Sequence, residues 1–243
     1  MKIAGSGVIG AGEYNEEISV CGSGKINGNI SCNEFKCSGA VKAVGDIISC
    51  GDLKVSGTMR VGKNIKAANV KISGACTAEG DVVASGEITV SGNLKASGVI
   101  KASKIVAGGT VSAASGMEAE EIKIAGRIQS SGLINAEKVE IKLEHAENKI
   151  FGIGGSEINI YPGKTAAFVN NIPLLTKIVG CNIGTLEIED GIEGDTVKVA
   201  YIKCPSITGR VVEIGACCEI ECVKYSDSIS VDPEAIVGRC EKI

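Results

Sequence analysis

The sequence predicts an all-β fold, a β-helix solenoid in which each turn of about seventeen to eighteen residues holds three short strands. A five-residue pattern of apolar, variable, apolar, small and Gly residues recurs along the first half of the chain. Within each copy the apolar residues alternate with the others, as in a strand with one buried face. Hydrophobic residues make up 44% of the chain, aromatic residues only 3%, and Gly is frequent at 33 residues. This composition predicts thin, regularly layered packing of small apolar side chains.

The repeat has a nearly constant spacing. The first apolar residue of each copy defines a predicted core ladder, whose successive members are separated by steps of 17, 18, 17, 18, 17, 17 and 17. The small residue and Gly that follow each copy predict a sharp bend, since Gly permits backbone conformations that other residues avoid. The ladder consists of Ile18, Phe35, Leu53, Val70, Ile88, Ile105, Ile122 and Val139.

Two further apolar columns accompany the ladder. One precedes it by about five residues, with a small residue two positions after each member, and a weaker one follows it by about six. Three strands and tight corners make a triangular coil, and each coil needs its neighbours to bury its apolar face. The preceding column is Ile30, Ile48, Ile65, Val83, Ile100, Met117 and Ile134, with Cys32, Cys50, Ala67, Ser85, Ala102, Ala119 and Ala136 as the small residues. The following column is Met59, Leu94, Val111 and Ile128.

The regularity of the repeat divides the chain into four parts. Residues 1–17 form an N-terminal cap or first turn, and residues 18–142 form the regular β-helix, which has no room for the long loops that build a cleft. Residues 143–182 form an irregular junction or a decorated turn, with a short helix or an inserted hairpin as alternatives for 165–179. Residues 183–243 form a less regular β-helical part. We expect one continuous rod with a decorated middle.

Composition and charge argue against several classes of function. The net charge is −4, and the chain has few aromatic residues and no basic tract, so it lacks the features of a nucleic-acid-binding protein. No stretch approaches the roughly 20 apolar residues of a transmembrane segment. The first residues lack the apolar region of a secretory signal. We therefore expect a cytoplasmic protein, peripheral at the inner membrane only through partners.

The eleven cysteines predict core packing and neither disulfides nor a metal site. An odd number in a chain without a secretory signal argues against a disulfide framework. Cys32, Cys37 and Cys50 fall in columns of small apolar residues, where a free Cys is common. Cys217, Cys218 and Cys222 lie near one another in the sequence, with Cys204 and Cys240 elsewhere, but none of the pairs has the Cys-x2-Cys spacing of metal ligands. We expect no metal and no cofactor.

A hexapeptide-repeat acyltransferase is the main catalytic alternative, because its coil also takes about 18 residues. Such an enzyme generally uses a His as base, and the only His here is His145, which we interpret as a solvated residue at the turn where the repeat fails. Gly163–Thr165 is like the end of a phosphate-binding loop, but Ile158 stands where that loop needs its first Gly. We therefore expect no catalytic residue and no enzymatic activity.

Several segments near both ends of the chain carry a resemblance to a known family. They are Gly5–Gly7, Gly12–Tyr14, Gly22–Gly28, the Lys-x-Ser-Gly repeats, Ile192–Asp195, Val212–Gly215 and Cys218–Ile220. These segments resemble the bactofilin-like, polymer-forming cytoskeletal proteins of Firmicutes. The resemblance implies a right-handed β-helix that assembles end to end without nucleotide and acts as a scaffold for envelope, morphology or motility machinery. In that family the core is commonly shorter and has Pro-rich tails, whereas here the tails are short and the C-terminal part is longer.

The terminal turns are the predicted assembly contacts, because they present unpaired backbone groups that another subunit can complete. The expected partner is a second copy of the chain, with a paralogous bactofilin-like protein or envelope and motility machinery as further partners. A monomeric β-helical protein that binds another bactofilin-like protein is the third hypothesis. The candidate contact residues are Ile3, Val8, Ile9, Tyr14, Ile229, Val231, Ile236 and Val237.

Overall fold

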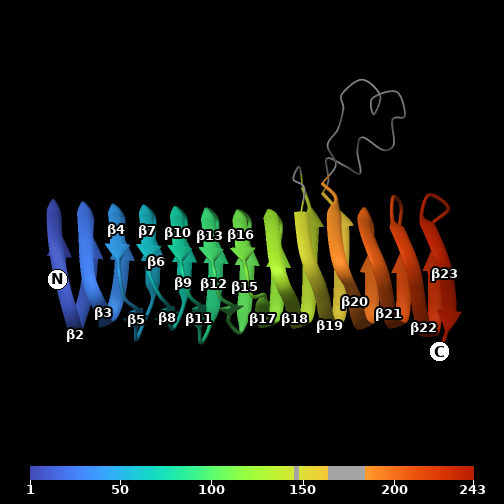
Figure 1. Ribbon diagram of the computed structural model, residues 1–243, viewed down its shortest axis with the longest axis horizontal. Coiled ribbons are helices and arrows are strands. Elements are labelled where there is room, and N and C mark those ends of the chain that lie inside the picture. The colour runs from blue at the N-terminus through green and yellow to red at the C-terminus, as the bar shows by residue number, and fades with distance from the viewer. Residues whose placement is uncertain (145–147, 164–183) are drawn as a thin grey trace, which may run out of the picture. The chain divides into compact units, whose positions relative to one another are not determined.

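The computed structural model describes residues 1–144, 148–163 and 184–243 (Figure 1). These residues form a parallel β-solenoid of about 13 turns, with about 17 residues per turn, and none of them lies in a helix. The all-β solenoid and its period are therefore confirmed, while the right-handed coil stays a prediction. The chain divides into two compact units, which we call the N-terminal unit, Met1–Glu120, and the C-terminal unit, Glu121–Ile243.

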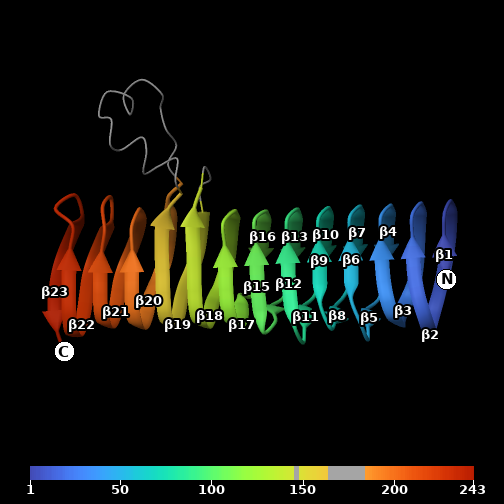
Figure 2. The same cartoon turned by 180° about the vertical axis from the view of Figure 1, so that it is seen from behind.

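The N-terminal unit begins with two long strands and continues with short ones. Its coils from Ala40 to Ala113 are divided into strands of two to four residues each, and the strands of successive coils stack on three faces (Figure 2). The boundary between the units falls within β17. The strands are β1 (Lys2–Ile3), β2 (Ser6–Val20), β3 (Ser23–Cys37), β4 (Ala40–Ala43), β5 (Ile47–Ser49), β6 (Leu53–Val55), β7 (Thr58–Val61), β8 (Ile65–Ala67), β9 (Val70–Ile72), β10 (Ala75–Ala78), β11 (Val82–Ala84), β12 (Glu87–Val90), β13 (Asn93–Ala96), β14 (Ile100–Lys101), β15 (Lys104–Ala107), β16 (Thr110–Ala113) and β17 (Met117–Ile124).

The predicted core ladder lies inside the coils. All eight of its side chains are at most 1% exposed. In the N-terminal unit successive members are register partners in adjacent strands, for example Leu53 with Val70 and Val70 with Ile88. The third apolar column is also buried, and the neighbouring coils add Val41 and Cys76 to it, through the pairs Val41 with Met59 and Cys76 with Leu94.

The prediction of the second apolar column is wrong by one residue in two turns. Ile47 and Val82 are fully buried in place of Ile48 and Val83, because β5 and β11 align them with the buried Ile65. The small residue of the first of these turns is therefore Ser49, which pairs with Cys32, and Cys50 is exposed instead of filling the core. In the second turn Ala84 is buried and Ser85 is exposed.

A column of Asn and Asp side chains at one corner explains this register. Asn29 Oδ1 accepts a bond from the Asp46 backbone N–H at 3.0 Å, and Asp46 Oδ1 accepts one from the Asn64 backbone N–H at 3.0 Å. Asn64 Oδ1 accepts one from the Asp81 N–H at 2.9 Å, and Asp81 Oδ1 one from the Val99 N–H at 2.9 Å. We call these four residues the Asx ladder. The residue after each member enters the core, so the ladder selects Ile47 and Val82.

The Ser-Gly corners are fixed by close backbone approach. A Cβ on Gly57 would lie 1.9 Å from the carbonyl oxygen of Gly39, and one on Gly109 would lie 2.0 Å from that of Gly92. No side chain fits at such a distance. The Gly that ends each repeat is therefore needed because the preceding coil lies directly against it.

The C-terminal unit is built from longer strands that continue around the corners. Between its strands the register shifts at β-bulges, for instance between Glu187 and Ile192 where β20 pairs with β21. Within the predicted irregular stretch 143–182, the structure forms β19, which pairs in parallel with β18 and β20. The segment 165–179 lies outside the described residues. The strands are β18 (Arg127–Leu143), β19 (Asn148–Pro162), β20 (Leu186–Val199), β21 (Ile202–Ile214), β22 (Glu219–Val231) and β23 (Ile236–Lys242).

Candidate assembly interfaces

In the last described coil of the C-terminal unit, the residues that continue the core columns are not fully buried. Val237 is the register partner of Ile220, and Cys240 is that of Val223; both partners are at most 3% exposed. Val237 itself is half-buried and Cys240 is exposed. No further coil of the described chain covers these two side chains.

The first half of the same coil shows the same change. Ile229 pairs with Val212, which is fully buried, and Val231 pairs with Ile214, which is 3% exposed. Ile229 is half-buried, and Val231 is 42% exposed. Ile229, Val231, Val237 and Cys240 together form what we call the C-terminal face. It is a cross-section of the core, and burying it in a contact would remove apolar surface from water.

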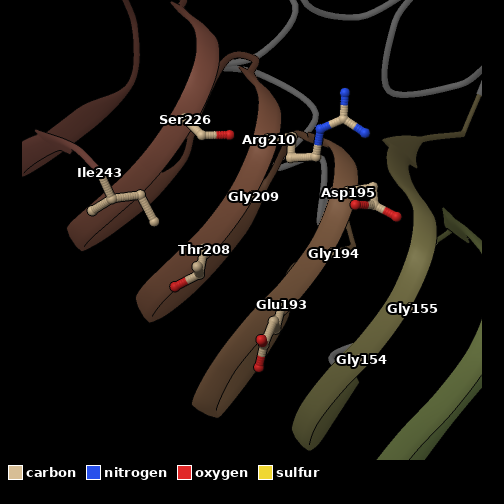
Figure 3. Close-up of a pocket in the computed structure, with 10 residues that line it drawn as sticks. All are labelled: Gly154, Gly155, Glu193, Gly194, Asp195, Thr208, Gly209, Arg210, Ser226 and Ile243. Carbon is tan, nitrogen blue, oxygen red and sulfur yellow. The ribbon is translucent and has the colours of Figure 1, made fainter.

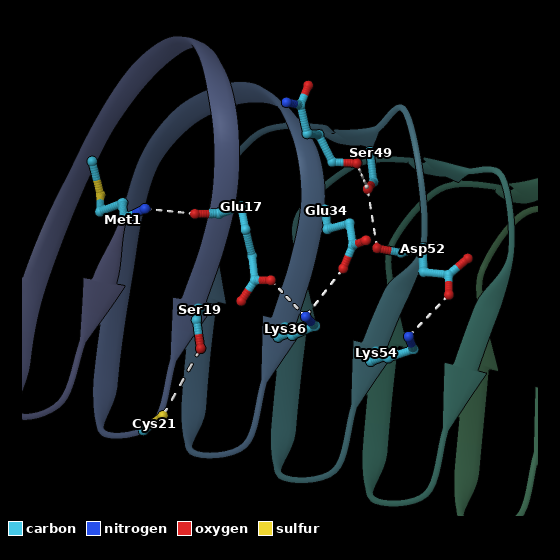
Figure 4. Close-up of polar contacts among 10 residues, drawn as sticks. Met1, Glu17, Ser19, Cys21, Glu34, Lys36, Ser49, Asp52 and Lys54 are labelled. Atoms are coloured by element: carbon cyan, nitrogen blue, oxygen red, sulfur yellow. Dashed lines mark hydrogen bonds and ion pairs between the residues drawn. The ribbon is translucent and has the colours of Figure 1, made fainter.

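The first coil of the N-terminal unit is closed by its own chain. The Met1 amino group donates to the Glu17 carbonyl oxygen at 2.6 Å (Figure 4). It also lies 2.5 Å from Glu16 Oε2, and the two contacts hold the first residues against the coil. Ile3 pairs with Val20, and its side chain lies 3.1 Å from where a Cβ of Gly7 would stand.

The closure extends to the neighbouring corner. The Tyr14 hydroxyl donates to the Gly10 carbonyl oxygen at 3.0 Å. Ile9 of the first coil is 1% exposed. Ile18 and Val20 are fully buried because β1 pairs with this part of β2 and covers them. The two ends thus differ in part. At the N-terminal end Ile9 is buried while Ile3 and Tyr14 are half-buried, whereas no member of the C-terminal face is buried.

The structure separates the candidate contact residues into four groups. Ile9 packs inside the first coil, so its side chain does not face a partner. Val8 is 65% exposed but heads an outward-facing column, because it pairs with Lys25. Ile236 is 68% exposed and also faces outward, as the register partner of Glu219. Ile3 and Tyr14 are half-buried and close the N-terminal coil, while Ile229, Val231 and Val237 lie on the C-terminal face.

Sequence reasoning missed Cys240 as a member of this face. The signal was its spacing from Val223, which equals the commonest step between members of the core ladder. Without the register of β22 and β23, an isolated Cys near the chain end gives no reason to place it over a buried Val.

Described residues of the C-terminal unit line two grooves on its outside. One, of about 440 Å³, follows the stacked glycines Gly155, Gly194 and Gly209, with Glu193, Asp195 and Arg210 beside them (Figure 3). The other, of about 790 Å³, runs across β20 to β23 and is lined by four glutamates, Lys203, Pro205 and Ile236, among others. The glutamates are Glu187, Glu189, Glu219 and Glu221, and we call this second hollow the acidic groove.

The buried cysteines have the environment of core residues. Burial raises the pKa of Cys32 and Cys37 to about 11, and that of Cys76 to about 12, because a thiolate loses hydration inside the coil. Burial also raises the pKa of Cys204 to about 11. These thiols are therefore poor nucleophiles near neutral pH. Within the described ranges no three His, Cys, Asp or Glu side chains are grouped so that they could hold a metal ion.

Most of the residues weighed for the acyltransferase and the phosphate-binding loop are outside the described residues. His145 is outside the described residues, as are Lys164 and Thr165, while Gly163 is buried after β19. In the part of the chain that the structure describes, no helix is long and apolar enough to span a membrane.

No model of a known protein family matches the chain, and no curated protein sequence or solved structure matches it either. The resemblance to bactofilin-like proteins therefore stays a prediction that rests on the segments named above. The β-solenoid class rests on the structure itself.

Proposed function

We propose that this protein is a self-associating structural scaffold of the bactofilin-like, polymer-forming kind. It acts in the cytoplasm by end-to-end assembly and by docking partners of the envelope or motility machinery, without catalysis, nucleotide or cofactor. The observation that carries the proposal is the C-terminal face, where Val231 and Cys240 are exposed although their register partners in the preceding coil are buried.

The physical reason is the stacking of the coils. Each coil buries its apolar face only against a neighbour, so a coil without one leaves a favourable burial unmade. The last strand of a stack also presents a free edge of backbone groups that another chain can pair with. A second copy satisfies both needs, and the contact is apolar, so it should depend little on salt.

The test is a pair of substitutions on this face. Val231→Asp with Val237→Asp should weaken self-association by roughly a hundredfold, since each charge prevents the burial of a Val side chain worth about 1.5 kcal/mol. Sedimentation velocity gives the assembly state, and negative-stain electron microscopy shows whether assemblies grow end to end. Circular dichroism confirms that the variant is folded.

A matched control carries two aspartates elsewhere. Val44→Asp with Leu133→Asp replaces two apolar side chains that are 50% and 46% exposed and lie outside the C-terminal face. This variant should assemble as the unmodified protein does. Maleimide labelling adds a second measurement, because Cys240 should be protected on assembly while the exposed Cys21 and Cys50 keep their rates. An unmodified protein that stays monomeric at high concentration contradicts the proposal.

A further inference from the structure

One outer face of the N-terminal unit carries a row of cations. Lys25, Lys42 and Arg60 are register partners on three successive coils, and Lys95 follows two coils later, after Thr77. All four cationic side chains are exposed. We call them the cation row. Because successive strands lie about 4.8 Å apart, three like charges stand one above another, an arrangement that destabilises a sheet unless anions approach it.

The face around the cation row contains no carboxylate. The strand segments that form it, 23–26, 40–43, 58–61, 75–78, 93–96 and 110–113, contain neither Asp nor Glu. The nearest carboxylates along the chain lie past the corner. Asp46 and Asp81 belong to the Asx ladder, and Glu79 accepts a hydrogen bond from Ser97. Among the described residues the cation row forms no ion pair, whereas Lys36, Lys54 and Lys101 on the other faces are all paired.

The acidic groove of the C-terminal unit has the opposite character. Its four glutamates lie on β20 and β22, and Lys203 on the strand between them is 3.1 Å from Glu219. Lys149 on β19 is 3.0 Å from Glu189 and 3.4 Å from Glu187. The glutamates thus outnumber these two lysines, and the ion pairs are exposed, so they are weak and exchange readily with other cations.

The two surfaces also fit in shape and repeat. The cation row consists of long, exposed side chains on one sheet face, and the acidic groove is a hollow of about 790 Å³. Both are built on parallel strands, so both repeat at the same coil spacing. The net charges of the two units also have opposite signs. The N-terminal unit has 12 Lys and Arg against 11 Asp and Glu, a net +1, and the C-terminal unit has 13 against 18, a net −5.

We propose that the cation row of one copy docks on the acidic groove of a second copy, so that the chain associates side by side as well as end to end. This inference rests on the proposed self-association and adds a second contact to it. The lateral contact joins exposed charges, so salt weakens it, whereas the apolar end contact depends little on salt.

The test uses charge reversal on each side of the contact. The first variant carries Lys25→Glu, Lys42→Glu and Arg60→Glu, and the second carries Glu187→Lys, Glu219→Lys and Glu221→Lys. Each is made in the Val231→Asp, Val237→Asp background, which removes the end contact, and in the unmodified protein. Sedimentation equilibrium at about 0.05 M and about 0.5 M salt measures association, and circular dichroism checks folding.

The background protein should dimerise at low salt and dissociate at high salt. Each reversed variant alone should associate at least about tenfold more weakly, and an equimolar mixture of the two should recover the affinity, because each again meets an opposite charge. In the unmodified protein the reversals should leave end-to-end assembly in place. If the unmodified protein pairs side by side but shows no end-to-end assembly, only the proposed function is contradicted. If it assembles end to end but shows no side-by-side pairing, only this inference is contradicted.

A matched control distinguishes the effect of the cation-row face from the effect of net charge. Lys63→Glu, Lys66→Glu and Lys71→Glu make the same change in net charge with three exposed lysines that lie off this face. The control should pair like the background protein. Equal loss in the control, or a mixture that stays monomeric, overturns the proposal. So does binding of the background protein to phosphatidylserine-containing vesicles through the cation row without any dimer, since that result assigns the face to a membrane.

Discussion

In the N-terminal unit the coils from Ala40 to Ala113 are divided into strands of two to four residues, whereas in the C-terminal unit the strands β18 to β22 each continue for 13 to 17 residues. The difference lies in the corners. The N-terminal unit holds them with the Asx ladder and with stacked Ser-Gly bends. The C-terminal unit turns them with β-bulges, at each of which the register shifts by one residue.

The two kinds of corner go with different variation in coil length. Where side chains of the Asx ladder bond to the next coil, the step along the sequence stays at 17 or 18. Where bulges turn the chain, the step falls to 15 between Val197 and Val212 and rises to 19 between Val139 and Ile158. The coils that carry the Asx ladder therefore keep a nearly constant length, whereas the coils of the C-terminal unit vary in length.

The largest expected effect breaks a Ser-Gly corner. Gly109→Ala should destabilise the protein by about 3 kcal/mol, because its Cβ would meet the Gly92 carbonyl oxygen at 2.0 Å and the backbone must shift. Gly209→Ala in the C-terminal unit should cost less, since the nearest atom is 2.9 Å away. Gly108→Ala is the control, with nothing within 4 Å. Urea unfolding followed by circular dichroism measures all three, and equal losses would contradict the comparison.

A smaller effect is expected from the Asx ladder. Asn64→Ala should lower the free energy of unfolding by about 1–2 kcal/mol, because the Asp81 N–H loses its acceptor and Asp46 loses a donor at 2.9 Å. Asn93→Ala, an exposed position on β13, should change it by less than about 0.5 kcal/mol. The same urea experiment compares them. If Asn64→Ala is as mild as Asn93→Ala, the ladder does not hold the corner.

The contact between Asn69 and Asp52, which also joins side chains of neighbouring coils, should make stability depend on pH. The hydrogen bond from Asn69 at 3.0 Å, and then Lys54, lower the pKa of Asp52 below its ordinary value of 3.8. A carboxyl whose pKa is lower in the folded state adds stability above its unfolded-state pKa and loses that stability as the pH falls through the folded-state pKa.

The stability difference between the unmodified protein and Asn69→Ala should therefore narrow from about pH 7 to about pH 2.5. It should not vanish, because Asn69 Oδ1 also accepts a bond from the Glu87 N–H at 3.0 Å at any pH. Urea midpoints along the pH series give the result, with Asn93→Ala as the pH-independent reference. A constant difference would show that the Asp52 contact contributes nothing.

The smallest effect concerns the charged exterior of the C-terminal unit. Arg210 donates to Asp227 at 3.1 and 3.3 Å, but both side chains are at least half exposed. Arg210→Ala should thus change the free energy of unfolding by about 0.5 kcal/mol or less. Comparison with Arg210→Lys isolates the geometry of the pair. A loss as large as that of Asn64→Ala would mean that ion pairs hold this unit as firmly as the ladder holds the other.

Much of the fold could be predicted because the repeat is periodic. One buried residue per coil, such as Leu53 or Ile88, is visible from spacing alone, and the Gly of each corner follows from the same spacing. The pattern failed where two β-branched residues adjoin, at Ile47 with Ile48 and at Val82 with Val83. Local alternation does not distinguish such neighbours, and only pairing with the next coil does.

The candidate interfaces were less predictable. The terminal turns were expected to make contacts, but Ile9 and Val231 look alike as apolar residues near an end of the sequence. One is buried because Tyr14 and the first residues close its coil, and the other is 42% exposed because no described coil covers it. The cation row and the acidic groove escaped prediction altogether, since most of their members are separated along the sequence by at least a full turn of the coil.

By itself the sequence determined the class of fold, the length of the coil and the ladder of residues that face inward, because these depend on a period that recurs along the chain. The tertiary structure decided which neighbour of a β-branched pair is buried, which end of the core is closed, and which charges share a face. Those properties depend on contacts between coils, and each contact joins residues that the sequence separates by a full turn.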